Sequence, residues 1–151
     1  MKNPASKGRG MERTSRWAYW VAAWLFLAGL VVQVFLAGMV VVAFRMSWAN
    51  HIGLGHSLSL PLLLMLVAAY LGRFPVSMKR LTWLLFAVYV LQADVVIFLR
   101  GQAPVVAALH PVLALVDFAV VLALARDAWT LARQGPTPAS VQPEMRISAT
   151  S

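Results

Sequence analysis

The run WAYWVAAWLFLAGLVVQVFLAGMVVVAF, residues 17–44, decides the fold of this chain. It contains no acidic or basic residue and lies between Arg16 and Arg45. A helix needs about 20 apolar residues to cross the hydrocarbon core of a bilayer, so this run predicts a transmembrane helix. The run is longer than the apolar region of a signal peptide, and no clean cleavage site of small residues follows it. We therefore expect the helix to be retained.

Three further apolar runs follow, at about residues 48–71, 81–99 and 104–125, and charged residues lie at their borders. With 61% hydrophobic and only 12% charged residues, the chain is too apolar for a soluble domain of 151 residues. The sequence thus predicts an all-α domain over residues 16–132, a bundle of four transmembrane helices. Residues 1–15 are polar and basic, and residues 133–151 are rich in Pro, Ser and Thr, so we expect both tails to be disordered.

Lysine and arginine are distributed unequally between the two sides of the predicted bundle. Eleven of the thirteen lie in the N-terminal tail, in the loop between the second and third helices, or after the fourth helix. Only Arg45 and Arg100 lie on the opposite side. The positive-inside rule then predicts that both termini are cytoplasmic. It also explains the net charge of +8 as a topology signal, so we expect no nucleic-acid partner.

The chain contains no cysteine, which excludes disulfides, thiolate metal sites, iron–sulfur clusters and covalent c-type haem. Histidine and carboxylate are the strong metal ligands that remain. Polar side chains are costly inside a membrane unless they face the bundle interior and find a partner, so each one needs an explanation. The predicted helices contain seven: Gln33, His51, His56, Gln92, Asp94, His110 and Asp117.

A weak internal repeat relates the two halves of the chain. Aligning VQVFLAGMVVVAFRMSWANH with LQADVVIFLRGQAPVVAALH places Gln33 on Gln92 and His51 on His110. In each half, a glutamine in one helix is followed by an outer loop and a histidine early in the next helix. The repeat predicts two pseudo-symmetric helix pairs, with the histidines of the second and fourth helices facing each other.

Two imidazoles that face each other across a four-helix bundle can supply both axial ligands of haem b. We therefore predict haem b ligated by His51 and His110. Gly53 and Gly55 would leave room on the second helix for the macrocycle or for close contact with another helix. Arg45 and Arg100 are expected to pair with the haem propionates. Asp94 is expected to form a hydrogen bond with the free ring nitrogen of a ligating histidine. Gln33 and Gln92 are expected either as supporting residues around the ligands or as interhelical hydrogen-bond partners.

Two histidines of the second predicted helix are candidates for the haem ligand that pairs with His110. The repeat pairs His110 with His51, whereas depth counted from the cytoplasmic side pairs it with His56. The two candidates are five positions apart, roughly 140° around a helix, so both cannot face one point equally well. His51 is the candidate that the repeat favours, and His56 is the alternative.

The stretch from Gln92 to Arg126, with a loop containing Pro104 and then ALH opening an apolar helix, resembles a repeat of the haem A synthase membrane family. Residues 32–51 resemble a looser version. The resemblance implies a four-helix half-unit in which His110 is the fourth-helix haem ligand and His51 or His56 the second-helix ligand. That family has an acidic residue and an arginine beside its second-helix histidine, and NHIGLGH has neither. We therefore expect no catalytic activity of the chain's own.

The pattern also resembles small, uncharacterised four-helix membrane proteins of bacteria, which implies a bacterial inner membrane. The first functional hypothesis is electron transfer, or an accessory subunit of a respiratory or photosynthetic complex, with quinone or other membrane redox subunits as partners. The second is a proton-coupled carrier that uses Asp94, Asp117 and His110. The third is a cofactor-free structural or assembly subunit, which an oligomer or a larger complex would accommodate.

Overall fold

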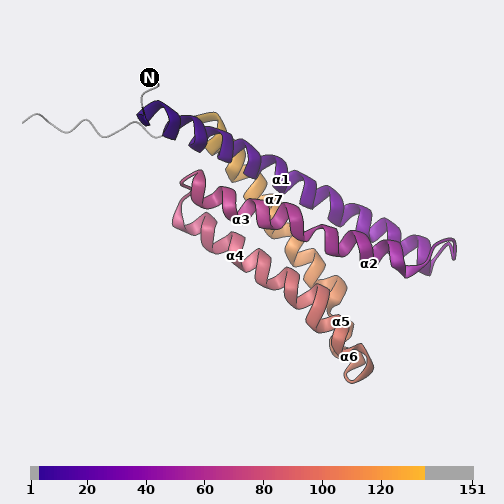
Figure 1. Ribbon diagram of the computed structural model, residues 1–151. Coiled ribbons are helices and arrows are strands. Elements are labelled where there is room, and N and C mark those ends of the chain that lie inside the picture. Colours follow the sequence, from indigo (N-terminus) through magenta and orange to yellow (C-terminus); the bar gives the residue numbers. More distant parts are fainter. Residues whose placement is uncertain (1–3, 135–151) are drawn as a thin grey trace, which may run out of the picture.

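The computed structural model describes residues 4–134, and these residues form four helical rods with short connections (Figure 1). The first rod is the single helix α1 (Pro4–Val41). The second consists of α2 (Trp48–Ser57) and α3 (Ser59–Leu71). The third joins α4 (Val76–Val90), the π-helix η1 (Leu91–Val95), α5 (Val96–Phe98) and the 3₁₀-helix η2 (Leu99–Gly101). The fourth comprises α6 (Pro104–Ala107) and α7 (His110–Gln134).

Each rod is long and apolar enough to cross a membrane, over Gly8–Val41, Trp48–Leu71, Val76–Gly101 and Pro104–Gln134. The prediction of an all-α protein with four helices long and apolar enough to span a membrane is therefore confirmed, which is the pattern of a multi-pass membrane protein. Large apolar side chains lie exposed along all four rods. In a bilayer these side chains face lipid, which is as apolar as they are.

The rods form an up-and-down bundle. Helix α1 packs most extensively against α3 and α7, while α4 packs against α3 and α7 on the other side. The start of α1, the α3–α4 turn and the end of α7 lie at one end of the bundle, which we call the terminal end (Figure 1). The opposite end, with the α1–α2 and η2–α6 connections, is the far end. There, the α1–α2 pair and the α5–α6 region diverge from each other (Figure 1).

The packed core lies toward the terminal end. Its largest fully buried side chains include Tyr19, Phe26, Leu62, Met65, Leu85 and Leu124. The hydroxyls of Tyr19 and Thr82 share a hydrogen bond of 2.7 Å inside this core, between α1 and α4. Helices α2 and α6, by contrast, contain no buried residue. The bundle is therefore closed at the terminal end and open at the far end.

Two prolines explain the interruptions in the second and fourth rods. The break between α2 and α3 falls at Leu58, three residues before Pro61. The Pro61 ring has no N–H and crowds the carbonyl one turn earlier, so a regular helix cannot continue there. The break between α6 and α7 likewise precedes Pro111. As a result, His110 is the first residue of a new helix.

Most of the segment predicted as a disordered tail over residues 1–15 is helical, because α1 already begins at Pro4, while residues 1–3 lie outside the described part of the chain. Glu12 and Arg16 are buried and form an ion pair of 2.6 Å one helical turn apart. The Arg16 guanidinium also donates to the carbonyls of Gly72 at 3.1 Å and Leu131 at 3.3 Å. These bonds attach the basic segment to the ends of α3 and α7, so it folds as part of the bundle.

Other predicted boundaries shift as well. The third rod begins at Val76 rather than near residue 81, and α7 continues to Gln134 rather than ending near residue 125. Of the C-terminal tail predicted over residues 133–151, the first two residues belong to α7. Residues 135–151 lie outside the described part of the chain.

Candidate functional site

The far end of the bundle brings two histidines from different rods together. His51 lies near the start of α2 and His110 opens α7. Their ring centroids are 6.1 Å apart, and the ring planes are inclined by 65°. Both side chains are only half-buried. We call these two residues the histidine pair.

Each ring of the histidine pair is held through the same nitrogen. The Nδ1 atom of His51 lies 3.1 Å from the Gln33 carbonyl oxygen, and Nδ1 of His110 lies 2.9 Å from the Gln92 carbonyl oxygen. A carbonyl oxygen only accepts hydrogen bonds, so each Nδ1 carries a proton and donates it. The lone pair of each imidazole is therefore on Nε2, the atom left to accept a proton or bind a metal.

The π-helix η1 makes the Gln92 carbonyl available. At the end of η1, the Val96 N–H donates to the Leu91 carbonyl, five residues back. The Gln92 carbonyl, which would be the partner of Val96 in an α-helix, is thereby skipped. It accepts the His110 ring instead. Single-turn π-helices of this kind occur frequently at functional sites.

His56 has a different environment from His51. Its Nδ1 lies 3.0 Å from the Ile52 carbonyl one turn earlier, and its Nε2 lies 3.8 Å from Asp94 Oδ1. Both side chains of this pair are largely exposed, His56 by 68% and Asp94 by 55%. His51 is thus the second-rod histidine whose ring contacts that of His110. Asp94, expected beside a histidine of that pair, faces His56 instead.

A buried polar pair joins η1 to α7, and its member on α7 lies about two turns beyond His110. Asp117 is fully buried and accepts a hydrogen bond of 3.2 Å from Gln92 Nε2. Among the described residues, Gln92 Oε1 and Asp117 Oδ1 are buried without a hydrogen-bond partner. Gln92 therefore connects Asp117, through its side chain, to His110, through its backbone.

The two glycines between the second-rod histidines play different parts. A Cβ atom on Gly55 would lie 2.7 Å from Gln33 Nε2, and the Gly55 carbonyl accepts a hydrogen bond from the Tyr89 hydroxyl. Gly55 therefore permits close contact of α2 with α1 and α4. A Cβ atom on Gly53 would meet nothing within 4 Å, so this glycine borders open space.

The two arginines of the far end are exposed. Arg45 lies in the α1–α2 connection and Arg100 in η2. Trp48 lies edge-to-face with the His51 ring at 5.4 Å. The only sign of that contact in the sequence is the three-residue spacing on one helix.

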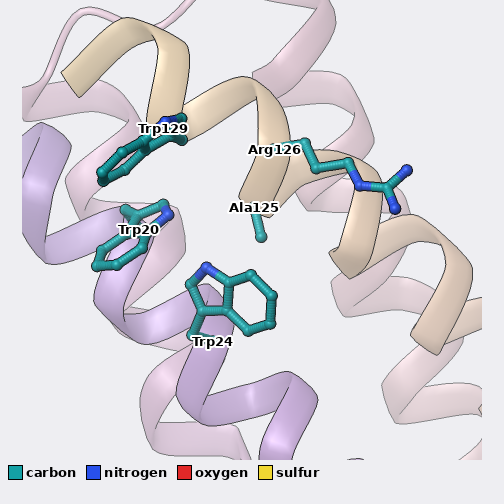
Figure 2. A pocket seen from close by; sticks show the side chains of 5 residues that line it. All are labelled: Trp20, Trp24, Ala125, Arg126 and Trp129. Carbon is teal, nitrogen blue, oxygen red and sulfur yellow. The ribbon is translucent and has the colours of Figure 1, made fainter. Parts of the chain in front are cut away.

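A cavity of about 300 Å³ lies at a distance from the histidine pair, lined by Trp20, Trp24, Ala125, Arg126 and Trp129 (Figure 2). The Trp20 and Trp129 rings are 5.2 Å apart, and the Arg126 guanidinium extends away from the three indoles (Figure 2). Arg126 is sixteen residues beyond His110 on α7, which is about 24 Å along a helix. The cavity is therefore not part of the histidine pair.

The histidine pair offers two ring nitrogens as ligands to a metal ion. Within residues 4–134, no group of three or more His, Cys, Asp or Glu side chains is placed to hold a metal ion. A zinc site of protein ligands alone needs three or four such groups.

Fold and site together define a multi-pass, four-helix membrane protein with a pair of histidines between its second and fourth rods. Over residues 33–97 the chain is similar to DUF6220, a family of unknown function. The matched region contains Gln33, His51 and Gln92 and ends before His110. The comparisons with curated proteins and with solved structures gave no match.

Proposed function

We propose that this protein binds haem b in the membrane, with His51 and His110 as the two axial ligands. The observation that carries the proposal is that both rings donate through Nδ1 to backbone carbonyls, of Gln33 and of Gln92. A histidine that ligates a metal usually donates its other ring N–H to such an acceptor, which fixes the tautomer and strengthens the ligand.

The ring separation supports the same proposal. A metal–nitrogen bond is about 2 Å, and a ring nitrogen is about 1 Å from its centroid, so two imidazoles on one iron have centroids roughly 6 Å apart. The centroids of His51 and His110 are 6.1 Å apart. The residues present thus fit a bis-histidine haem. Bound there, haem b would supply a one-electron couple between ferrous and ferric iron.

The other residues of the far end would complete the site. Arg45 and Arg100 are exposed at this end, where they can form charge-assisted hydrogen bonds with propionates. Gly53 borders open space on α2. Since α2 and α6 bury no residue of their own, their apolar side chains are available to cover a flat macrocycle and exclude water.

We assign this haem protein to electron transfer, either alone or as an accessory subunit of a respiratory or photosynthetic complex in a bacterial inner membrane. Of the eleven Lys and Arg residues within the described residues 4–134, nine lie toward the terminal end, which supports cytoplasmic termini. Two pseudo-symmetric helix pairs are supported by the equal separation of eighteen residues in Gln33–His51 and in Gln92–His110.

The experiment is a pyridine haemochrome assay on the protein isolated from membranes, with one haem b per chain expected. His51→Ala and His110→Ala should each lower the haem content at least tenfold. His56→Ala is the matched control, since it removes an imidazole from the same helix and should retain haem. Absence of haem from the unaltered protein, or equal loss in all three variants, would contradict the proposal.

A second candidate is a proton-coupled carrier, favoured by one observation. Gln92 bonds with Asp117 through its side chain and with His110 through its backbone carbonyl, so one residue holds both a carboxyl and an imidazole inside the bundle. Proton flux into liposomes that contain the protein tests this candidate. Flux that Asp117→Asn abolishes without loss of haem would favour the carrier over the electron-transfer protein.

A further inference from the structure

An ionisable pair lies on the surface between α2 and η1. His56 and Asp94 face each other there, with side chains exposed by 68% and 55%. Both belong to membrane-spanning stretches, and His56 is eight residues after Trp48, where the second stretch begins. Eight helical residues correspond to about 12 Å of depth. Ionisable side chains at such a depth are costly and generally mark a function.

The geometry of the pair leaves room for a third group. The Nε2–Oδ1 distance of 3.8 Å exceeds the 2.7–3.2 Å of a good hydrogen bond. His56 Nδ1 is already bonded to the Ile52 carbonyl, so the ring presents Nε2 to the space beside Asp94. Asp94 itself lies on the π-helix. An oxygen atom with a proton to give or to accept can therefore bond with Nε2 and with the carboxylate together.

The surroundings of the pair limit what such a ligand can be. Exposed apolar side chains flank it on both rods, among them Ile52, Leu60, Leu91 and Val95. A ligand that reaches this depth from the bilayer has to be soluble in hydrocarbon. It also has to carry a hydroxyl or carbonyl oxygen, because the pair offers only hydrogen bonds and charge.

We propose that His56 and Asp94 bind the head group of a membrane-soluble quinone or hydroquinone. The carboxylate and neutral Nε2 accept from a hydroquinone hydroxyl, and a protonated His56 donates to a quinone carbonyl. The electron-transfer role of this quinone site rests on the proposed function. His56 is five residues from His51, about 7.5 Å along α2, so the quinone would lie near the haem. Binding itself does not require haem.

Photolabelling with a short-chain azidoquinone, on the protein in lipid nanodiscs, tests the site. Labelling should concentrate on the peptides that contain His56 and Asp94, and excess unlabelled ubiquinone should compete with it. His56→Leu and Asp94→Asn should each reduce labelling at least fivefold. Ser57→Ala is the matched control, because Ser57 is also exposed, bonds only within α2 and should label as the unaltered protein does.

The same labelling in His110→Ala separates this inference from haem binding. Labelling that persists in this variant, and that His56→Leu or Asp94→Asn lowers, supports the quinone site even if no haem is found. Labelling spread evenly over the lipid-facing peptides overturns the site. Labelling that neither variant changes overturns it as well, and circular dichroism of each variant verifies that its helices are retained.

Discussion

The two ends of the bundle are held together by different means. At the terminal end, bulky side chains such as Phe26 and Leu85 are fully buried. Arg16, paired with Glu12, also bonds α1 to the ends of α3 and α7 there. At the far end, the α1–α2 pair and the α5–α6 region diverge (Figure 1). The contacts between rods there include single hydrogen bonds and the contact of the His51 and His110 rings. Lipid provides no hydrophobic drive for helices to associate, so packing and polar contacts decide where they meet. We infer that one end carries stability and the other carries the ligand.

The largest expected effect comes from opening the terminal end. Arg16→Ala leaves Glu12 buried without this arginine and removes the bonds to the Gly72 and Leu131 carbonyls. Removing one partner of a buried ion pair costs about 3–5 kcal/mol of unfolding free energy. Denaturant unfolding in detergent micelles measures the loss. Arg13→Ala, at an exposed position three residues earlier, should leave the unfolding curve unchanged.

The buried acid–amide pair is the next point at which to separate stability from ligand binding. Asp117→Ala leaves Gln92 without its side-chain partner, which should cost about 1–3 kcal/mol. Asp117→Asn keeps both a donor and an acceptor facing the Gln92 amide, so it should cost much less. Unfolding of the two variants under the same conditions compares them. Equal losses would mean that shape, rather than hydrogen bonding, is what Asp117 contributes.

The glycine pair of α2 tests how closely the rods approach at the far end. In Gly55→Ala the new methyl group would meet Gln33 Nε2, the end of a flexible side chain that has to move aside, so we expect a loss at the lower end of the range of about 1–3 kcal/mol typical of overpacking. Gly53→Ala meets open space and should not destabilise the protein by overpacking. Thermal unfolding of the two variants measures the difference. Loss of stability in Gly53→Ala alone would show that α2 is oriented differently in the membrane.

The smallest expected effect concerns the bond between α4 and α2. Tyr89→Phe removes the hydroxyl that donates to the Gly55 carbonyl and keeps the ring. Interhelical hydrogen bonds in membranes contribute about 0.6 kcal/mol on average. A decrease of this size in unfolding free energy, with faster amide hydrogen exchange near Gly55, is the expected result. A decrease as large as that of Arg16→Ala would remove the distinction between the two ends.

Much of the fold could be predicted from the sequence because a bilayer imposes strict requirements on length and apolarity. The four spanning rods follow from these requirements, whereas the helical conformation of residues 4–15 does not. That segment is polar and basic, and its place in the bundle depends on carbonyls at Gly72 and Leu131, far away in the chain. The composition of a segment does not indicate contacts with residues so distant in the sequence.

The candidate site was predictable in part, for a similar reason. The repeat in the sequence paired His51 with His110, and the structure places these two rings in contact. The part that could not be predicted involves the backbone: the rings bond with the carbonyls of Gln33 and Gln92, and a π-helix frees the second of these. Side-chain patterns indicate neither a π-helix nor the pairing of His56 with Asp94. Haem ligation and the orientation in the membrane stay predictions.

The central claim is that one iron is bound by both members of the histidine pair, and electron paramagnetic resonance of the oxidised protein tests it most directly. We predict a low-spin ferric signal typical of two imidazole ligands. Any haem retained by His51→Ala or His110→Ala should become high-spin, while His56→Ala should keep the low-spin signal. A low-spin signal that persists without His51 or His110, or a complete absence of haem from the unaltered protein, would contradict the account.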